Sequence, residues 1–121
     1  MTQLSLAILY VDDPARSAAF YSGLLGLKTI EQSPTFCMLA LPSGLALGLW
    51  SRGTVEPAAA AAGGGGELAF TAADVDAVHA EWAERGLPIL QAPTEMDFGR
   101  TFVALDPDGH RLRVFRPTPG Q

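Results

Sequence analysis

The sequence predicts an α+β fold made of two βαβββ repeats that form a curved mixed sheet around a cavity, with the helices on the outer face. Two predicted helices open with an aspartate, Asp13 or Asp74, and end at a glycine, Gly26 or Gly86. The aspartates stand 61 positions apart and the glycines 60. An apolar, strand-like run precedes each helix and a strand–turn–strand pattern follows it. The chain therefore repeats one unit, and a cavity shared by the repeats is where function is expected.

The first repeat is expected over residues 1–51. It opens with a nearly apolar run at 4–11 that is typical of a buried strand. Asp13 is suited to cap the helix, and Pro14 to its first position, where a missing N–H costs nothing. The helix extends to about residue 25 and ends at Gly26. Further strands are predicted at 28–32, 35–41 and 45–51, with the turn Pro42-Ser43-Gly44 joining the last two.

The second repeat is expected over residues 67–117. Its helix spans about 74–85, with Val75, Val78 and Trp82 on the buried stripe, and Gly86 stops it. Strands are predicted at 67–72, 88–94, 100–105 and 111–116, with the strong turn signal Asp106-Pro107-Asp108-Gly109 joining the last two.

Residues 52–66 separate the repeats within what we expect to be a single domain over residues 1–121. Pro57 precedes five alanines, and four glycines follow them, so any helix here is limited to a turn or two. A mobile linker is the favoured interpretation, and a functional lid is the alternative.

Composition excludes several classes of function. The chain has 121 residues, of which 48% are hydrophobic and 17% charged, which suits one compact domain. A net charge of −5 without a basic stripe argues against nucleic-acid binding. The apolar runs are far shorter than the roughly 20 residues of a membrane span. The N-terminus lacks the pattern of a signal peptide, and the single cysteine, Cys37, fits a reducing cytoplasm.

The order of these motifs resembles the vicinal oxygen chelate superfamily, which includes glyoxalase I, extradiol dioxygenases and bleomycin-resistance proteins. The final segment is most similar to phenazine-resistance-type binding proteins of that superfamily. The resemblance covers nearly the whole chain outside the linker. The matching segments are VDDPARSAAFY at 11–21, LLGL at 24–27, ELAF at 67–70, DVDA at 74–77 and FGRTFVALDPDGHRLRVF at 98–115.

Metal-dependent members of that superfamily hold the ion with four His or Glu ligands, one on the first and one on the last strand of each repeat. Counted from the helix-opening aspartates and the turn glycines, the equivalent positions here are Leu6, Gly48, Glu67 and Arg113. Leucine and glycine offer no ligand atom, and a guanidinium has no lone pair to donate. We therefore expect no metal at this site and no cofactor.

Strand alternation predicts what takes the place of the metal, since residues in phase with those four positions should face the cavity. The predicted lining is mostly apolar and aromatic, with small residues leaving room for a flat ring. Trp50 and Phe115 stand at equivalent positions and are suited to stack on it. Arg113 could bind a carboxylate or carbonyl, and Glu67 could pair with Arg113 or accept a ligand N–H. The predicted ligand-binding residues are Trp50, Arg113, Phe115, Glu67, Leu6, Gly48, Ile8 and Phe102.

Structural roles are the alternatives. Trp50 could be core or a dimer contact, and Glu67 and Arg113 could form only an ion pair that fills the former metal site. Phe36, Phe98 and Phe102 are interpreted as packing residues, although Phe102 could reach the cavity. Tyr21 and Trp82 on the helices are also interpreted as packing residues.

The leading hypothesis is a metal-independent binding protein that sequesters a planar aromatic small molecule, as in antibiotic resistance. No catalytic residue is predicted, because His79, His110 and Cys37 lie in no activating pattern. The resemblance also implies a homodimer. The alternatives are a metal-dependent lyase or dioxygenase with an atypical site, and a ligand-sensing or assembly domain with a vestigial pocket.

Overall fold

The computed structural model describes residues 4–61, 63 and 66–118. Its contacts divide the chain into two compact units, Met1–Gly63 and Gly64–Gln121. The division falls inside the segment 52–66 that the sequence marks as a linker. Each unit has the order strand, helix and three strands, so the predicted βαβββ repeat is confirmed. The two units are described in turn.

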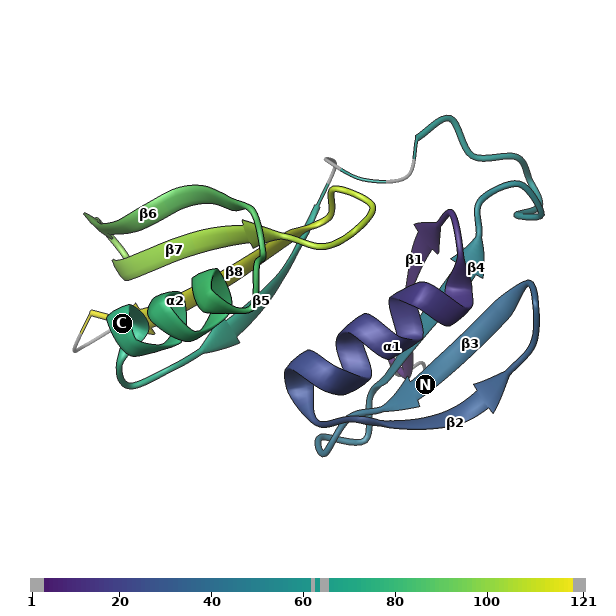
Figure 1. The fold of residues 1–121 in the computed structure, drawn as a ribbon, viewed down its shortest axis with the longest axis horizontal. Coiled ribbons are helices and arrows are strands. Elements are labelled where there is room, and N and C mark those ends of the chain that lie inside the picture. The colour runs from purple at the N-terminus through teal and green to yellow at the C-terminus, as the bar shows by residue number, and fades with distance from the viewer. Residues whose placement is uncertain (1–3, 62, 64–65, 119–121) are drawn as a thin grey trace. The chain divides into compact units, whose positions relative to one another are not determined.

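The first unit contains one helix and one four-stranded sheet (Figure 1). The sheet order is β1-β4-β3-β2, with β1 parallel to β4 and the other neighbours antiparallel. The parallel pair follows from the helix, which carries the chain from β1 across the sheet. The elements are β1 (Leu6–Val11), α1 (Pro14–Leu25), β2 (Lys28–Gln32), β3 (Phe36–Ala40) and β4 (Ala46–Ser51).

Helix α1 begins and ends where the sequence predicts. The Asp13 carboxylate accepts hydrogen bonds from the backbone N–H of Ala15 at 3.1 Å and of Arg16 at 3.3 Å. Pro14 occupies the first turn, where it forfeits no hydrogen bond. At the other end Gly26 adopts a left-handed conformation, with φ at 67°, which a glycine reaches without steric cost.

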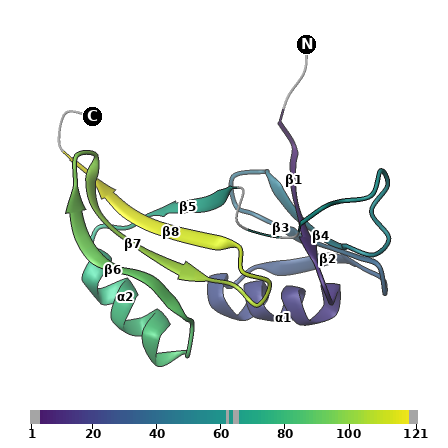
Figure 2. The same ribbon diagram turned by 90° about the horizontal axis from the view of Figure 1, so that it is seen from above.

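The core of the first unit lies between α1 and one face of its sheet. Figure 2 shows the helix lying along that face. Alternate residues of β3 and β4 point to it, and they are all buried: Cys37, Leu39, Leu47 and Leu49. From the helix, Tyr21 is fully buried, so its predicted packing role is confirmed.

The second unit repeats this plan with the sheet order β5-β8-β7-β6 and β5 parallel to β8. Asp74 caps the helix by accepting from the Ala77 N–H at 3.0 Å, and Gly86 follows it with φ at 88°. The elements are β5 (Glu67–Thr71), α2 (Val75–Glu84), β6 (Ile89–Met96), β7 (Gly99–Leu105) and β8 (Arg111–Pro117).

An aromatic cluster forms the core beneath α2. The Trp82 ring lies edge-on to Phe102, with centroids 5.5 Å apart, and to Phe70 at 6.0 Å. Trp82 and Phe102 are buried, and Leu112 and Val114 of β8 are fully enclosed on the same face. Trp82 is therefore a packing residue, as the sequence predicts.

The strands form two four-stranded mixed sheets, one in each unit, in agreement with the predicted pair of βαβββ repeats. One expectation about burial needs correction. The first strand is less buried than its apolar sequence implies, because only Val11 is enclosed and the side chains that point away from α1 are partly exposed. Among the described residues, neither helix is long and apolar enough to cross a membrane.

Candidate functional site

Each sheet has one face opposite its helix, and we call these the first and second open faces. On the first, the register places Leu6 beside Ala46, Ile8 beside Gly48 and Tyr10 beside Trp50. Phe36 and Met38 of β3 continue the same face, next to Trp50 and Gly48. Ile8 is 40% exposed although it is apolar. The predicted alternation is therefore correct on these strands, and the face is apolar and partly accessible.

Phe36 covers the middle of the first open face. A Cβ at position 48 would lie 2.9 Å from Cζ of Phe36 and 3.3 Å from Cδ1 of Leu6. The room that the small residue was expected to leave for a ligand is therefore taken by the Phe36 ring. This ring also lies edge-on to Trp50, with centroids 6.4 Å apart and planes at 88°.

The second open face carries an ion pair between Glu67 of β5 and Arg113 of β8. Nε of Arg113 lies 2.6 Å from Oε1 of Glu67, and Nη2 lies 3.4 Å from Oε2. Nη1 donates to Oγ1 of Thr101 at 3.2 Å. The side chains of Arg113 and Glu67 are 19% and 33% exposed. The two predicted charged residues are therefore brought together, and they bind each other.

A pair of aromatic rings lies on the Arg113 side of this ion pair. The guanidinium carbon of Arg113 lies 5.8 Å from the centroid of the Phe98 ring, a cation–π distance. Phe98 is in turn edge-on to Phe115, with centroids 6.1 Å apart. Sequence reasoning placed Phe115 here but gave Phe98 a packing role and overlooked Thr101. Strand phase could have identified Thr101, because it pairs with Phe115 and its side chain therefore lies on the same face of the sheet.

Phe102 does not lie on the open face. It pairs with Val114, in the opposite strand phase to Arg113, and it is fully buried beneath α2. Its ring contacts Trp82 and His79, with the His79 centroid at 5.3 Å. The expectation that Phe102 reaches a ligand is corrected, because alternation assigns its side chain to the core.

The four positions equivalent to the superfamily's metal ligands do not fit a divalent ion. Only Glu67 has a ligand atom, and both of its oxygens face the Arg113 guanidinium. The Phe36 ring occupies the space beside Gly48, and Leu6 is apolar. A divalent metal needs several oxygen, nitrogen or sulfur donors together. Within the described ranges no three His, Cys, Asp or Glu side chains gather into such a set.

The nucleophiles and bases considered from sequence lie in the protein's packing. Cys37 is a free, fully buried thiol beneath α1. His110 is buried, and its backbone N–H donates to the Asp106 carboxylate at 2.8 Å within the predicted turn. His79 lies half-buried against Phe102. These positions support structural roles.

A second ion-pair cluster joins α2 to the sheet beneath it. Arg100 donates to both carboxylate oxygens of Asp76, at 2.7 and 2.8 Å, and to Glu95 at 3.0 Å. The hydrogen bonds from Arg100 hold the pKa of the Asp76 carboxyl below its ordinary value. The same bonds raise the pKa of Arg100. Arg100 is in phase with Phe102 on β7, so this cluster belongs to the helix side of the sheet.

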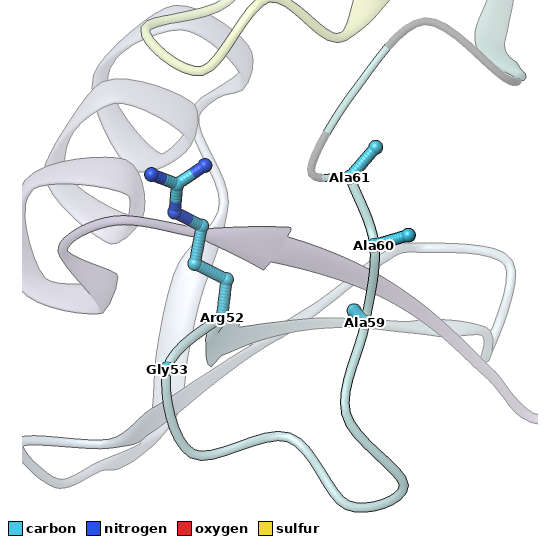
Figure 3. Close-up of a pocket in the computed structure, with 5 residues that line it drawn as sticks. All are labelled: Arg52, Gly53, Ala59, Ala60 and Ala61. Atoms are coloured by element: carbon cyan, nitrogen blue, oxygen red, sulfur yellow. The ribbon is translucent and has the colours of Figure 1, made fainter.

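A shallow pocket of about 340 Å³ lies in the segment after β4 (Figure 3). It is lined by Arg52, Gly53 and the three alanines at 59–61. Nε of Arg52 lies 2.6 Å from Oδ1 of Asp12, which neutralises the one charged group of the lining. Methyl groups and backbone make up the rest, so the pocket offers little chemistry for recognising a ligand.

Comparison with known proteins agrees with the fold. Residues 3–114 match the family described as the Glyoxalase/Bleomycin resistance protein/Dioxygenase superfamily. Over 115 residues, the chain is 30% identical to the phenazine antibiotic resistance protein EhpR of Enterobacter agglomerans. The match covers 91% of this chain and 88% of EhpR.

Solved structures extend the comparison. Protein ATC0852 from Agrobacterium tumefaciens is 51% identical, with a TM-score of 0.89 and 98% and 99% of the two chains covered. TnmS3, an antibiotic binding protein from Streptomyces sp. CB03234, is 24% identical with a TM-score of 0.75, covering 98% of each chain, and shares the fold. The family match over residues 3–114 and the identity to EhpR establish that the chain belongs to the Glyoxalase/Bleomycin resistance protein/Dioxygenase superfamily.

Proposed function

We propose that this protein binds and sequesters a planar aromatic small molecule without a metal, on the open faces of its two sheets. The observation that carries the proposal is the clustering of aromatic rings on those faces. Trp50 and Phe36 are edge-on on the first, and Phe115 and Phe98 on the second. Edge-on rings of this kind present flat surfaces on which another ring can stack, worth about 0.5–1.5 kcal/mol per pair beyond burial.

Two further observations support binding in preference to catalysis. The side chains at the superfamily's metal-ligand positions cannot assemble a donor set, so they provide no Lewis acid. The buried thiol of Cys37 and the buried His110 are not placed to act on a ligand at either open face. The identity to EhpR, named as a phenazine antibiotic resistance protein, supports a phenazine-like ring as the ligand class.

We also propose that the protein is a homodimer. Ile8 on the first open face is 40% exposed, and Leu4 just before β1 is 79% exposed. Apolar groups gain about 25 cal/mol per Å² when they are removed from water. Association of two chains would cover such surface. Native mass spectrometry reports the mass of the assembly and any retained ligand together, and a monomer at micromolar concentration contradicts this part of the proposal.

Titration with phenazine tests the binding function. Calorimetry on the wild-type protein should give saturable binding. In the same titration, Trp50→Ala should reduce the affinity of the first open face about tenfold, and Phe115→Ala should do the same for the second open face. The matched control is Trp82→Phe, because Trp82 is buried beneath α2 and its replacement by a smaller ring changes an aromatic side chain of the core only.

The measured affinities of the variants either support or contradict the proposed binding function. Loss of affinity in Trp50→Ala or Phe115→Ala, with Trp82→Phe unchanged, supports binding on the open faces. Equal affinity in all variants shows that the ligand binds elsewhere. No saturable binding of phenazine or of other planar heteroaromatics to the folded wild-type protein refutes the function.

A further inference from the structure

We infer that the Glu67–Arg113 ion pair makes the second open face selective for uncharged planar aromatic ligands that bear a hydrogen-bond acceptor, and that it discriminates against their carboxylate analogues. This inference rests on the proposed function, because it defines the chemical class of ligand that the same site accepts. Sequence reasoning left a carboxylate and a carbonyl as equal candidates for Arg113.

The ion pair neutralises the positive charge of Arg113, which would otherwise attract an anionic ligand. Glu67 approaches Arg113 side-on, with one short contact of 2.6 Å from Nε and a longer one of 3.4 Å from Nη2. This pairing occupies the Nε–Nη2 edge, which is one of the two edges at which a guanidinium binds a carboxylate through two N–H groups. Both side chains are mostly enclosed, at 19% and 33% exposed, so solvent screens their interaction only in part.

Displacing Glu67 would leave its carboxylate beside the incoming one. Two like charges at such a distance are unfavourable, and a partly enclosed carboxylate without its partner bears a desolvation cost. A ligand carboxylate therefore either competes with an intramolecular partner that is already in place or binds at the remaining N–H groups, where it is repelled by the Glu67 carboxylate. Arg111 also lies on this face, next to Glu67 in the register, but it is exposed and its attraction for an anion is screened.

An uncharged acceptor meets no such competition. A guanidinium carries five N–H donors, and Arg113 uses three of them, to the two Glu67 oxygens and to Thr101. Within residues 4–61, 63 and 66–118, the other two N–H groups, both on the terminal nitrogens, have no hydrogen-bond acceptor, and we assign them to a ligand. The Thr101 hydroxyl donates to the Val114 carbonyl at 2.9 Å while it accepts from Arg113, and Thr101 is fully buried. The guanidinium is thus held at both ends.

The rings beside the ion pair set the shape of the ligand. Phe98 lies 5.8 Å from the guanidinium carbon, and Phe115 is edge-on to Phe98. A flat ring stacked on Phe115 would bring a ring nitrogen or a ring carbonyl at its edge toward the free N–H groups of Arg113. A neutral heteroaromatic ring with an acceptor in its periphery matches this arrangement of apolar surface and donors.

The test compares phenazine with phenazine-1-carboxylate at pH 7.5, by calorimetry, on the wild-type protein and on Glu67→Gln. Wild type should bind phenazine about tenfold or more tightly than the carboxylate. Glu67→Gln frees the Arg113 charge, so the carboxylate should gain at least about tenfold and become salt-dependent, while phenazine changes little. Glu84→Gln is the matched control, since it makes the same change in net charge at an exposed position on α2.

A second variant pair guards against an indirect effect of Glu67→Gln. In the Glu67→Gln/Arg113→Gln double variant the gain for the carboxylate should vanish, because the gain requires the freed guanidinium. Two results would assign anion binding to Arg111 and overturn the inference. One is that Glu67→Gln still increases carboxylate affinity when Arg113 is also replaced by glutamine. The other is that this increase disappears in Glu67→Gln/Arg111→Gln. Urea unfolding of each variant verifies that it is folded.

The outcomes separate this inference from the function on which it rests. If wild type binds phenazine but binds the carboxylate equally well or more tightly, the proposed selectivity is wrong and the proposed binding function is still supported. The selectivity is also contradicted if Glu67→Gln prefers phenazine over the carboxylate by the same factor as wild type. Failure of both compounds to bind any folded variant overturns the proposed function and the inference with it.

Discussion

The Phe36 ring lies against the point where a Cβ at position 48 would stand, with Cζ 2.9 Å and Cε1 3.0 Å from that point. Phe36 of β3 pairs with Trp50 and Met38 pairs with Gly48, so the Phe36 ring reaches Gly48 diagonally across the neighbouring strand, on the open face of the first sheet. The φ angle of Gly48 is not positive, so the backbone itself would accept alanine. The close approach of the ring is therefore what favours glycine here.

Gly48→Ala should destabilise the wild-type protein but stabilise the Phe36→Ala variant. In wild type the added methyl forces the ring aside, whereas without the ring alanine gains about 0.5–1 kcal/mol over glycine in a strand. Urea unfolding of the four proteins in a double-mutant cycle should give a coupling free energy of roughly 1–2 kcal/mol. Additive effects would show that the ring does not constrain position 48.

The Asp76–Arg100 pair should make stability depend on pH. The folded-state pKa of Asp76 is lowered from 3.8, so its contribution is present above the unfolded-state pKa and is lost as the pH falls through the lower folded-state value. The difference in unfolding free energy between wild type and Asp76→Asn should therefore be constant above about pH 5 and shrink below about pH 4. Glu84→Gln is the control, and a difference that does not change with pH would contradict the assignment.

The two helix caps should each be worth about 1 kcal/mol. Asp13→Ala leaves two N–H groups of α1 without their acceptor, and Asp74→Ala leaves one in α2. Each should lower the unfolding free energy by roughly 0.5–2 kcal/mol in urea titrations, whereas Asp13→Asn should retain most of the stability. Loss of stability in Asp13→Asn as large as in Asp13→Ala would show that the charge matters more than the cap.

Phe102→Leu should reduce stability and leave ligand affinity unchanged. The side chain is fully enclosed against Trp82 and His79, and its truncation loses packing without touching the open face. We expect a loss of roughly 1–2 kcal/mol in unfolding free energy, below the 3–5 kcal/mol typical of Phe→Ala. If Phe102→Leu changes phenazine affinity without changing stability, Phe102 contacts the ligand after all.

Metal analysis tests independently whether the protein binds a divalent ion. Protein purified without chelators and measured by inductively coupled plasma mass spectrometry should contain far less than one divalent ion per chain, because Glu67 is the sole donor among the four equivalent positions. A stoichiometric metal that is lost in Glu67→Gln would support the alternative of an enzyme with an atypical site.

Local chemistry made most of the fold predictable from sequence. Asp13, Pro14 and Gly26 carry capping and turn preferences that act over a few residues, and the helix limits follow from them. The alternation of Leu47 and Leu49 with Gly48 likewise placed the buried and open sides of β4. Strand ends moved by one or two residues, since hydrogen-bond pairing with a neighbour decides where a strand stops.

The candidate site was predictable in part. Strand phase assigned Glu67, Arg113 and Phe115 to one face, because side chains alternate with a period of two. It did not place Phe98, which precedes β7 and comes near Arg113 only through the turn between β6 and β7. Of the two roles that the sequence left open for Phe102, packing is the one that strand phase on β7 favours, because Phe102 pairs with Val114 on the buried side.

The sequence by itself determined the duplicated βαβββ unit, the limits of its helices and the absence of ligand atoms at Leu6 and Gly48, because these depend on residue type and short-range order. Only the tertiary structure decided how the polar groups are used. It joined Glu67 to Arg113 at 2.6 Å and laid the Phe36 ring over Gly48. Such contacts depend on side-chain rotamers and on registers between strands distant in sequence, which no local pattern encodes.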